Sequence, residues 1–201
     1  MKINVNYHSS IQIGNIYIDP YGIRDNVNDA SYIFITHSHY DHYSLVDISK
    51  VINDSTIFVC TKDVYEDFKN YYKNEVVISE PNSKYNVYGL SFETFPSYNI
   101  NKKFHPRLNN WVGYLINVNN EKYCIIGDSD LTEEVRNIKC DILFVPIGGT
   151  YTMNAKDASE LTNIIKPDLV VPVHYNAIVG NKKDEKDFID NLKNIKYQLF
   201  L

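Results

Sequence analysis

Short apolar stretches dominate the first third of the chain and predict strands rather than helices. Polar or glycine turns separate the first three stretches, which predict an antiparallel meander over Ile3 to Tyr7, Ile11 to Ile13 and Ile16 to Ile18. Two longer apolar runs, Tyr32 to Thr36 and Thr56 to Cys60, predict buried strands. The hydrophobic pattern therefore begins as that of a β-sheet.

Helical spacing of apolar residues follows these strands. Between about Lys62 and Lys73 the apolar positions recur with a period close to that of an amphipathic helix: Val64, Tyr65, Phe68, Tyr71 and Tyr72. Three further helices are predicted at about Tyr43 to Lys50, Ala155 to Ile165 and Asp184 to Leu192.

A second strand-rich section begins near Val76, and its last strands alternate with helices. The predicted strands are Leu90 to Phe95, Val112 to Val118, Lys122 to Ile126, Ile142 to Pro146 and Leu169 to Val173, with a hairpin turn at Asn119-Asn120. Two strand-rich halves, each closing with strands and helices, predict an α/β protein, a four-layer αββα sandwich of two mixed β-sheets. With 201 residues and no linker, we expect residues 1–201 to form a single domain.

The composition of the chain indicates which classes of binding partner to expect. The net charge of −5 is not that of a protein with a basic track for nucleic acid or anionic membrane, so a small-molecule substrate is expected. No apolar run approaches the roughly 18 residues of a membrane span. Cys60, Cys124 and Cys140 form no C-x-x-C pair, which predicts reduced thiols that act as small buried hydrophobes in a cytoplasmic protein. The sequence sets no oligomeric state.

The run His37-Ser38-His39-Tyr40-Asp41-His42 is the main candidate for chemistry, because it places four potential metal ligands directly after a predicted strand. Imidazole and carboxylate suit zinc and its divalent neighbours, and alternation along an extended chain points His37 and His39 to the same side. Asp41 and His42 fall where the chain turns into a helix, which would direct them at a second ion. The run therefore predicts a binuclear metal site.

Two later residues lie at the ends of predicted strands. Asp128 follows Gly127 after the run Tyr123 to Ile126, where a carboxylate could bridge two metals or simply occupy a turn or helix cap. His174 follows Leu169 to Val173, where open α/β sheets gather ligands, although a single histidine there could equally be a core residue.

Taken together, these motifs resemble the metallo-β-lactamase superfamily in their order and separations. Flanking segments resemble its small, stand-alone metal-dependent hydrolases, including a lactonase-like branch: His8-Ser9-Ser10, Ile18-Asp19-Pro20, Pro146 to Met153 and Pro172 to Tyr175. The resemblance implies an αββα fold with the metals in a cleft at the edge of the two sheets. It also implies ligand roles: His37 and His39 on the first metal, Asp41, His42 and His174 on the second, and Asp128 on both.

Supporting roles follow from the same resemblance. Asp19 would orient a ligand or pack beneath the metals, and His8 would have either a polar role near the metals or a hydrogen-bonded structural one. The chain departs from the family pattern at one ligand of the first metal. The family usually supplies a histidine from the turn after a mid-chain strand, and the corresponding stretch here, Phe95 to Asn99, contains none. His105 is the nearest candidate, as the missing ligand, as a substrate-binding residue or as an exposed side chain.

The site so assembled predicts hydrolysis by a metal-bound hydroxide. We expect two divalent metal ions, with zinc as first choice and manganese or iron as alternatives, acting on a small ester, lactone or phosphoester. Asp128 would position the hydroxide, and Asp41 would help to orient it or shuttle a proton. Both are catalytic candidates.

Two segments are candidates for substrate binding. The backbone N–H groups of Gly149, Thr150 and Tyr151 could face an anionic substrate, or the glycines could serve only a turn ahead of a helix capped by Asn154 with Asp157 as its partner. A basic loop around His105 could bind phosphate or carboxylate, or its charges could be solvated: Lys102, Lys103 and Arg107.

Three other functions share this fold. A metal-dependent nuclease would need a basic track that the chain lacks outside residues 102–107. A di-iron redox protein typically has glutamate in place of one histidine of the cluster, where this chain has His39. A non-catalytic binding protein would have no need for the full ligand set.

Overall fold

The computed structural model describes residues 2–201 and divides into two compact units. The first unit runs to Ser79 and includes Phe200, and the second runs from Glu80 to Leu199 and includes Leu201. Each unit contains one mixed β-sheet flanked by helices, as the hydrophobic pattern predicts.

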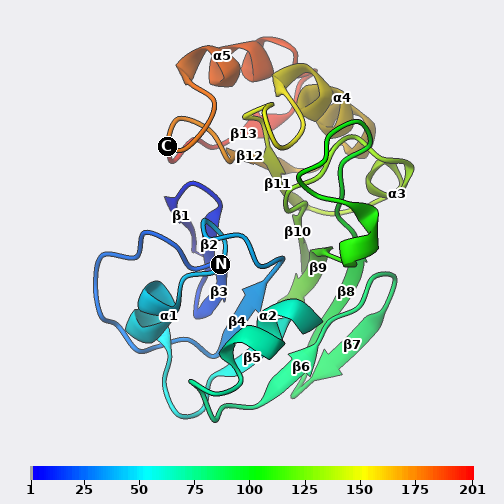
Figure 1. Cartoon of the computed structure of the whole chain (residues 1–201). Coiled ribbons are helices and arrows are strands. Elements are labelled where there is room, and N and C mark those ends of the chain that lie inside the picture. Colours follow the sequence, from blue (N-terminus) through cyan, green and yellow to red (C-terminus); the bar gives the residue numbers. More distant parts are fainter. Residues whose placement is uncertain (1) are drawn as a thin grey trace. The chain divides into compact units, whose positions relative to one another are not determined.

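The sheet of the first unit has six strands in sequence order (Figure 1). Its first three strands pair antiparallel, which confirms the predicted meander, and the other pairs are parallel. The strands are β1 (Ile3–Tyr7), β2 (Ser10–Ile13), β3 (Ile16–Ile18), β4 (Tyr32–Ile35), β5 (Ile57–Cys60) and β6 (Val76–Ile78).

Two helices cover an apolar face of this sheet: α1 (Leu45–Val51) and α2 (Lys62–Phe68). Their buried side chains form one core with Ile33, Ile35 and Phe58 of the sheet. Helix α2 ends five residues before the predicted Lys73. The chain turns back there because the side-chain amide of Asn74 donates hydrogen bonds to two carbonyl groups beside β5.

The sheet of the second unit has seven strands in the order β13-β12-β11-β10-β9-β8-β7. Pairs from β7 to β10 are antiparallel, and those from β10 to β13 are parallel. The strands are β7 (Lys84–Val87), β8 (Leu90–Pro96), β9 (Val112–Val118), β10 (Glu121–Ile125), β11 (Ile142–Pro146), β12 (Leu169–Val173) and β13 (Lys196–Tyr197). The β9–β10 hairpin turns at Asn119 and Asn120, whose φ values of 52° and 66° suit asparagine.

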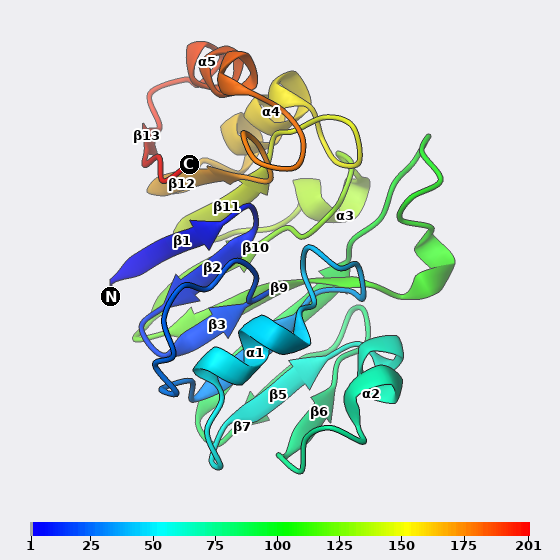
Figure 2. The same cartoon turned by 60° about the vertical axis from the view of Figure 1, so that its left-hand side comes forward.

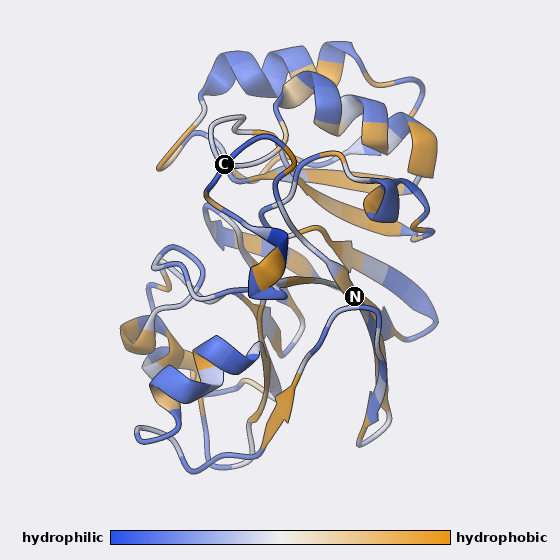
Figure 3. Ribbon diagram, turned by 45° about the vertical axis from the view of Figure 1, so that its right-hand side comes forward, coloured by the Kyte–Doolittle hydropathy of each residue, from blue (hydrophilic) through white to orange (hydrophobic). Residues whose placement is uncertain are grey.

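The helices of the second unit are η1 (Arg107–Asn109), α3 (Glu133–Arg136), α4 (Ala155–Ile165) and α5 (Lys182–Asp190). Helices α4 and α5 bury apolar residues in a common core with β10, β11 and β12, and hydrophilic and hydrophobic bands alternate along the helices in Figure 3. Asparagine side chains cap both helices, Asn154 on α4 and Asn181 on α5.

Two further features of the described residues bear on the cysteine and membrane predictions. Cys60, Cys124 and Cys140 are not in disulfides, and burial raises the pKa of the Cys60 thiol. Over residues 2–201, no helix combines the length and apolar character that crossing a bilayer requires.

Candidate metal centre

The first group of donors lies at one edge of the six-stranded sheet. His8 follows β1, and His37 comes two residues after β4. One donor atom from each of His8, Asp41 and His42 lies within 4.8 Å of the others. The Asp41 Oδ2 atom is 3.3 Å from His8 Nε2 and 3.9 Å from His42 Nε2. We call these three residues with His37 and His39 the first cluster.

The imidazoles of the first cluster also face one another. The ring of His37 is centred 4.7 Å from that of His39 and 4.2 Å from that of His42. The close packing of several imidazoles around one carboxylate is typical of a metal site. The run predicted from the sequence therefore folds so that its donors converge.

Asp19 lies behind the first cluster and binds one of its histidines, His42. Its Oδ2 atom is 2.8 Å from His42 Nδ1 and accepts the Thr36 hydroxyl at 2.7 Å, while Oδ1 accepts the Thr36 N–H at 2.8 Å. Burial raises the pKa of Asp19, although His42 and the bonds from Thr36 act in the opposite direction. A carboxylate on Nδ1 leaves Nε2 as the donor atom of His42.

The second group of donors lies in the seven-stranded sheet. Asp128 follows β10 and His174 follows β12, and these strands run parallel to the intervening β11, so their carboxyl ends meet at one edge. Asp128 Oδ2 is 3.0 Å from His174 Nε2 and 3.2 Å from His105 Nε2. We call Asp128, His105 and His174 the second cluster.

The donor chemistry of both clusters fits a divalent metal. Two ligand atoms bound about 2.1 Å from one tetrahedral ion lie about 3.4 Å apart. The distances of 3.0 and 3.2 Å in the second cluster are close to that value. Imidazole nitrogen with carboxylate oxygen suits zinc, manganese or iron.

His105 is not an exposed residue, so that alternative is wrong: its side chain is 2% exposed. The backbone N–H of His105 donates to Asn99 Oδ1 at 3.1 Å, and its Nδ1 is also 3.1 Å from that oxygen. Asn99 therefore orients the ring with Nε2 towards Asp128. The stretch that lacks the expected histidine supplies this asparagine instead, a role that sequence reasoning missed because no local pattern marks it.

The glycine turn after β11 leaves room for the backbone of His174, a candidate ligand. A Cβ atom on Gly148 would lie 2.2 Å from the carbonyl oxygen of His174, and Gly149 has φ of 81°. The Gly149 N–H donates to Met153 and the Thr150 N–H to Gly148, both at 3.0 Å. These bonds argue against the predicted use of the two N–H groups in anion binding. Asn154 caps helix α4 through the Asp157 N–H, as the spacing predicts.

The cations near His105 are largely engaged within the second unit. Lys102 Nζ binds the Asp130 carboxylate and donates to the Thr152 carbonyl at 2.8 Å. Arg107 donates to Glu134 at 2.6 Å. The structure thus contradicts the idea that all three cations of this loop are open to a phosphate or carboxylate ligand.

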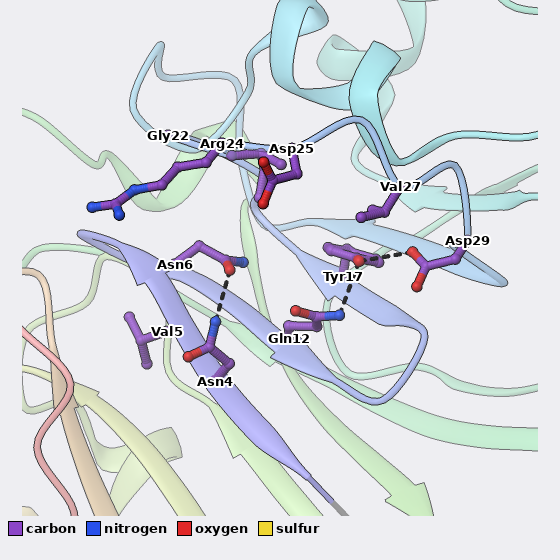
Figure 4. A pocket seen from close by; sticks show the side chains of 11 residues that line it. Asn4, Val5, Asn6, Gln12, Tyr17, Gly22, Arg24, Asp25, Val27 and Asp29 are labelled. Carbon is purple, nitrogen blue, oxygen red and sulfur yellow. Dashed lines mark hydrogen bonds between the residues drawn. The ribbon is translucent and has the colours of Figure 1, made fainter.

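A hollow of about 370 Å³ in the first unit is separate from the donors (Figure 4). Its floor carries a row of polar side chains in which Gln12 donates to the Tyr17 hydroxyl at 2.9 Å and Tyr17 donates to Asp29 at 2.8 Å. Burial and the Asp29 carboxylate raise the pKa of Tyr17. None of the residues that line it is a candidate metal ligand.

Comparison with known proteins decides the family. The β-lactamase superfamily domain matches residues 8–174, which begin and end on candidate donors. The chain belongs to the metallo-β-lactamase superfamily. The family predicted from the motifs is thereby confirmed.

Sequence alignments with relatives cover most of the chain. A UPF0173 protein of Pyrococcus abyssi is 29% identical over 174 residues, covering 85% of this chain and 79% of its own. A UPF0173 metal-dependent hydrolase of Nanoarchaeum equitans is 28% identical over 204 residues, covering 94% and 90%. The name of the second relative agrees with the predicted enzyme class, and the prediction of a metal-dependent hydrolase is confirmed.

Solved structures confirm the fold. A metal-dependent hydrolase from Parabacteroides distasonis aligns with a TM-score of 0.82 at 24% identity, covering 98% of this chain and 91% of the other. Igni18, a metallo hydrolase from Ignicoccus hospitalis, aligns with a TM-score of 0.75 at 20% identity, covering 98% and 93%. The superfamily member has the αββα type of fold that its sequence predicts.

Proposed function

We propose that this protein is a binuclear metal-dependent hydrolase of small esters, lactones or phosphoesters, and that both units form one catalytic domain. The observation that carries the proposal is a repeated arrangement of donors. In each cluster one carboxylate oxygen, that of Asp41 or Asp128, lies 3.0–3.9 Å from the Nε2 atoms of two histidines. Each unit thus offers carboxylate and imidazole donors, and together they suffice for two ions.

The proposed ligands come from both units. The family match encloses all the donors within residues 8–174, which supports their use in one centre. We assign His37, His39 and His105 to the first ion, Asp41, His42 and His174 to the second, and Asp128 to both. Zinc is the first choice for these nitrogen and oxygen donors, with manganese or iron as alternatives.

The bound ions would supply a Lewis acid for the scissile group and a water molecule activated near neutral pH. The chain supplies orientation and proton handling. Asp128 would position the attacking water, and Asp41 would help to orient it or take up its proton, while His8 Nε2, at 3.3 Å, keeps Asp41 in place. Asp19 fixes His42 through Nδ1, and the Thr36 hydroxyl does the same for His37 at 2.9 Å.

Metal analysis with a hydrolase panel tests this proposal. The wild type, saturated in turn with zinc, manganese or iron and then freed of excess ion, should retain about two ions per chain and hydrolyse at least one ester, lactone or phosphoester. Asp128→Ala should lose metal and activity together, because its carboxylate serves both ions. The matched control is Asp168→Ala, at an exposed carboxylate just before β12.

Two outcomes are decisive. Retention of about one ion or fewer by the wild type, with no effect of Asp128→Ala, would overturn the binuclear centre. His105→Ala separates the two remaining roles of that residue: loss of an ion identifies a ligand, whereas an increase in KM with full metal content identifies a substrate-binding residue.

A further inference from the structure

The segment from Asn99 to Asn110, which we call the 99–110 loop, joins β8 to β9 and carries His105. This green segment projects beyond the strands of its sheet in Figure 2. Three of its apolar side chains are exposed, Ile100 at 56%, Phe104 at 41% and Leu108 at 93%. A group of exposed apolar residues on one loop marks a binding surface more often than scattered single residues do.

The loop is held in place from inside its own unit. Asn99 Nδ2 donates to the Tyr151 carbonyl at 2.8 Å, and the Ile100 N–H donates to Asp130 Oδ2 at 2.9 Å. Lys102 adds its bonds to Asp130 and Thr152. A surface fixed in advance loses little conformational entropy when a ligand binds.

Ion pairs compensate two of the three cations of the loop. The charge of Lys102 is compensated by Asp130, and Arg107 is paired with Glu134 and lies over the Tyr98 ring, 4.8 Å from its centre. Two of the three cations of the loop are thus paired with carboxylates, and Lys103 is the third. A phosphate group would therefore meet two cations whose charge is already compensated, whereas a hydrocarbon would meet the exposed carbon of Ile100, Phe104 and Leu108.

Aromatic residues directly adjoin donors of both clusters in sequence. Phe104, directly before His105, packs edge to face on Tyr151 with ring centres 4.7 Å apart. In the first unit, Tyr21 lies 5.8 Å from Tyr7 and 6.3 Å from Tyr40. Tyr7 precedes His8, and Tyr40, which is 65% exposed, lies between two candidate ligands in sequence. Each unit thus has exposed aromatic residues next in sequence to its candidate metal ligands.

We propose that the 99–110 loop binds the non-reacting, apolar part of the substrate, so that the preferred substrates are esters or lactones with an aliphatic or aryl group of several carbons rather than sugar phosphates. Phe104 and Leu108 are its specificity-determining residues. The inference rests on the proposed hydrolase function. Burial of a methylene contributes about 0.8 kcal/mol, or up to about fourfold in kcat/KM for each added carbon.

A chain-length series tests the loop. For metal-loaded wild type, kcat/KM should rise from 4-nitrophenyl acetate through the butyrate to the octanoate, and a lactone with an alkyl tail should exceed a sugar-phosphate lactone. Phe104→Ala and Leu108→Ser should each reduce the octanoate-to-acetate ratio about tenfold, mainly through KM. The control is Tyr71→Ala, which removes a ring that is 68% exposed in the first unit and should leave the ratio unchanged.

Three results would overturn the inference: an unchanged ratio in both loop variants, a wild-type preference for the sugar phosphate, or a dimer that Leu108→Ser dissociates while the ratio stays constant. The last result would make the loop an interface between copies of the chain.

A binding measurement keeps this test separate from that of the proposed function. If the wild type hydrolyses no member of the panel, the hydrolase proposal fails, but calorimetric titration with octanoate and acetate still tests the loop. Tighter binding of octanoate that is lost in Phe104→Ala supports the apolar site, and equal binding of the two carboxylates contradicts it.

Discussion

At the scale of single residues, the site depends on side chains that orient the candidate ligands. Asp19 binds His42 and both the N–H and the hydroxyl of Thr36, and Thr36 in turn lies against the His37 ring. Asn99 has the corresponding position behind His105. These residues decide which imidazole nitrogen is left to face a metal ion in the proposed centre, a choice that residue type alone leaves open.

Asp19→Asn tests this orientation. The amide keeps the shape of the carboxylate but loses its charge and one acceptor, so we expect zinc affinity to fall about 10–100-fold. Competition with a chromogenic chelator measures the affinity. Asp25→Asn, at an exposed carboxylate in the same unit, should leave the affinity unchanged. Equal affinities of Asp19→Asn and the wild type would show that Asp19 serves packing only.

At the scale of elements, helix α1 holds the loop that follows β3. The Asp47 carboxylate accepts the N–H groups of Gly22 and Ile23, each at 3.1 Å, and pairs with Lys50 at 2.8 Å. Burial alone would raise the pKa of Asp47, but the bonds from Lys50, Ser44 and Gly22 outweigh it and hold this pKa below its ordinary value.

The lowered pKa predicts a pH-dependent contribution to stability. Because the folded state binds the Asp47 proton less tightly than the unfolded state, its stabilising effect is present above about pH 4 and is lost as the pH falls through the lower folded pKa. Asp47→Asn should reduce the free energy of unfolding at pH 7 by roughly 1–3 kcal/mol. Urea unfolding at pH 7 and pH 3 should show that this difference shrinks in acid; a constant difference would contradict the mechanism.

The elements that the sequence failed to predict are short or lie at sheet edges. Strand β13 has two residues and helix α3 has four, which is too few for a period to be seen. Edge strand β7 alternates exposed and half-buried positions and contains lysine and asparagine, which have low β-propensity. The long apolar runs and the amphipathic helix α4 were predictable because their periodicity is local.

At the scale of the whole molecule, metal binding at the proposed centre would stabilise the folded chain against unfolding. An ion that binds the folded chain at 1,000 times its Kd stabilises it by about 4 kcal/mol. For a chain of this size, that corresponds to a rise in Tm of roughly 8–16 °C. Thermal unfolding with zinc and with a chelator measures the difference. Asp128→Ala should lose most of it, and an equal shift in that variant would place the stabilising ion elsewhere.

The sequence by itself determined the donor types, their positions at strand ends and the family, because these signals are carried by neighbouring residues. The tertiary structure decided which residues far apart in the sequence contact one another. It brought His105 to Asp128 and Asn99 behind His105, and it compensated the charge of Lys102 with Asp130, 28 residues away. Such contacts arise from strand order and loop packing, which no local pattern encodes, and they compensate two of the three cations in a loop that its sequence alone marks as basic.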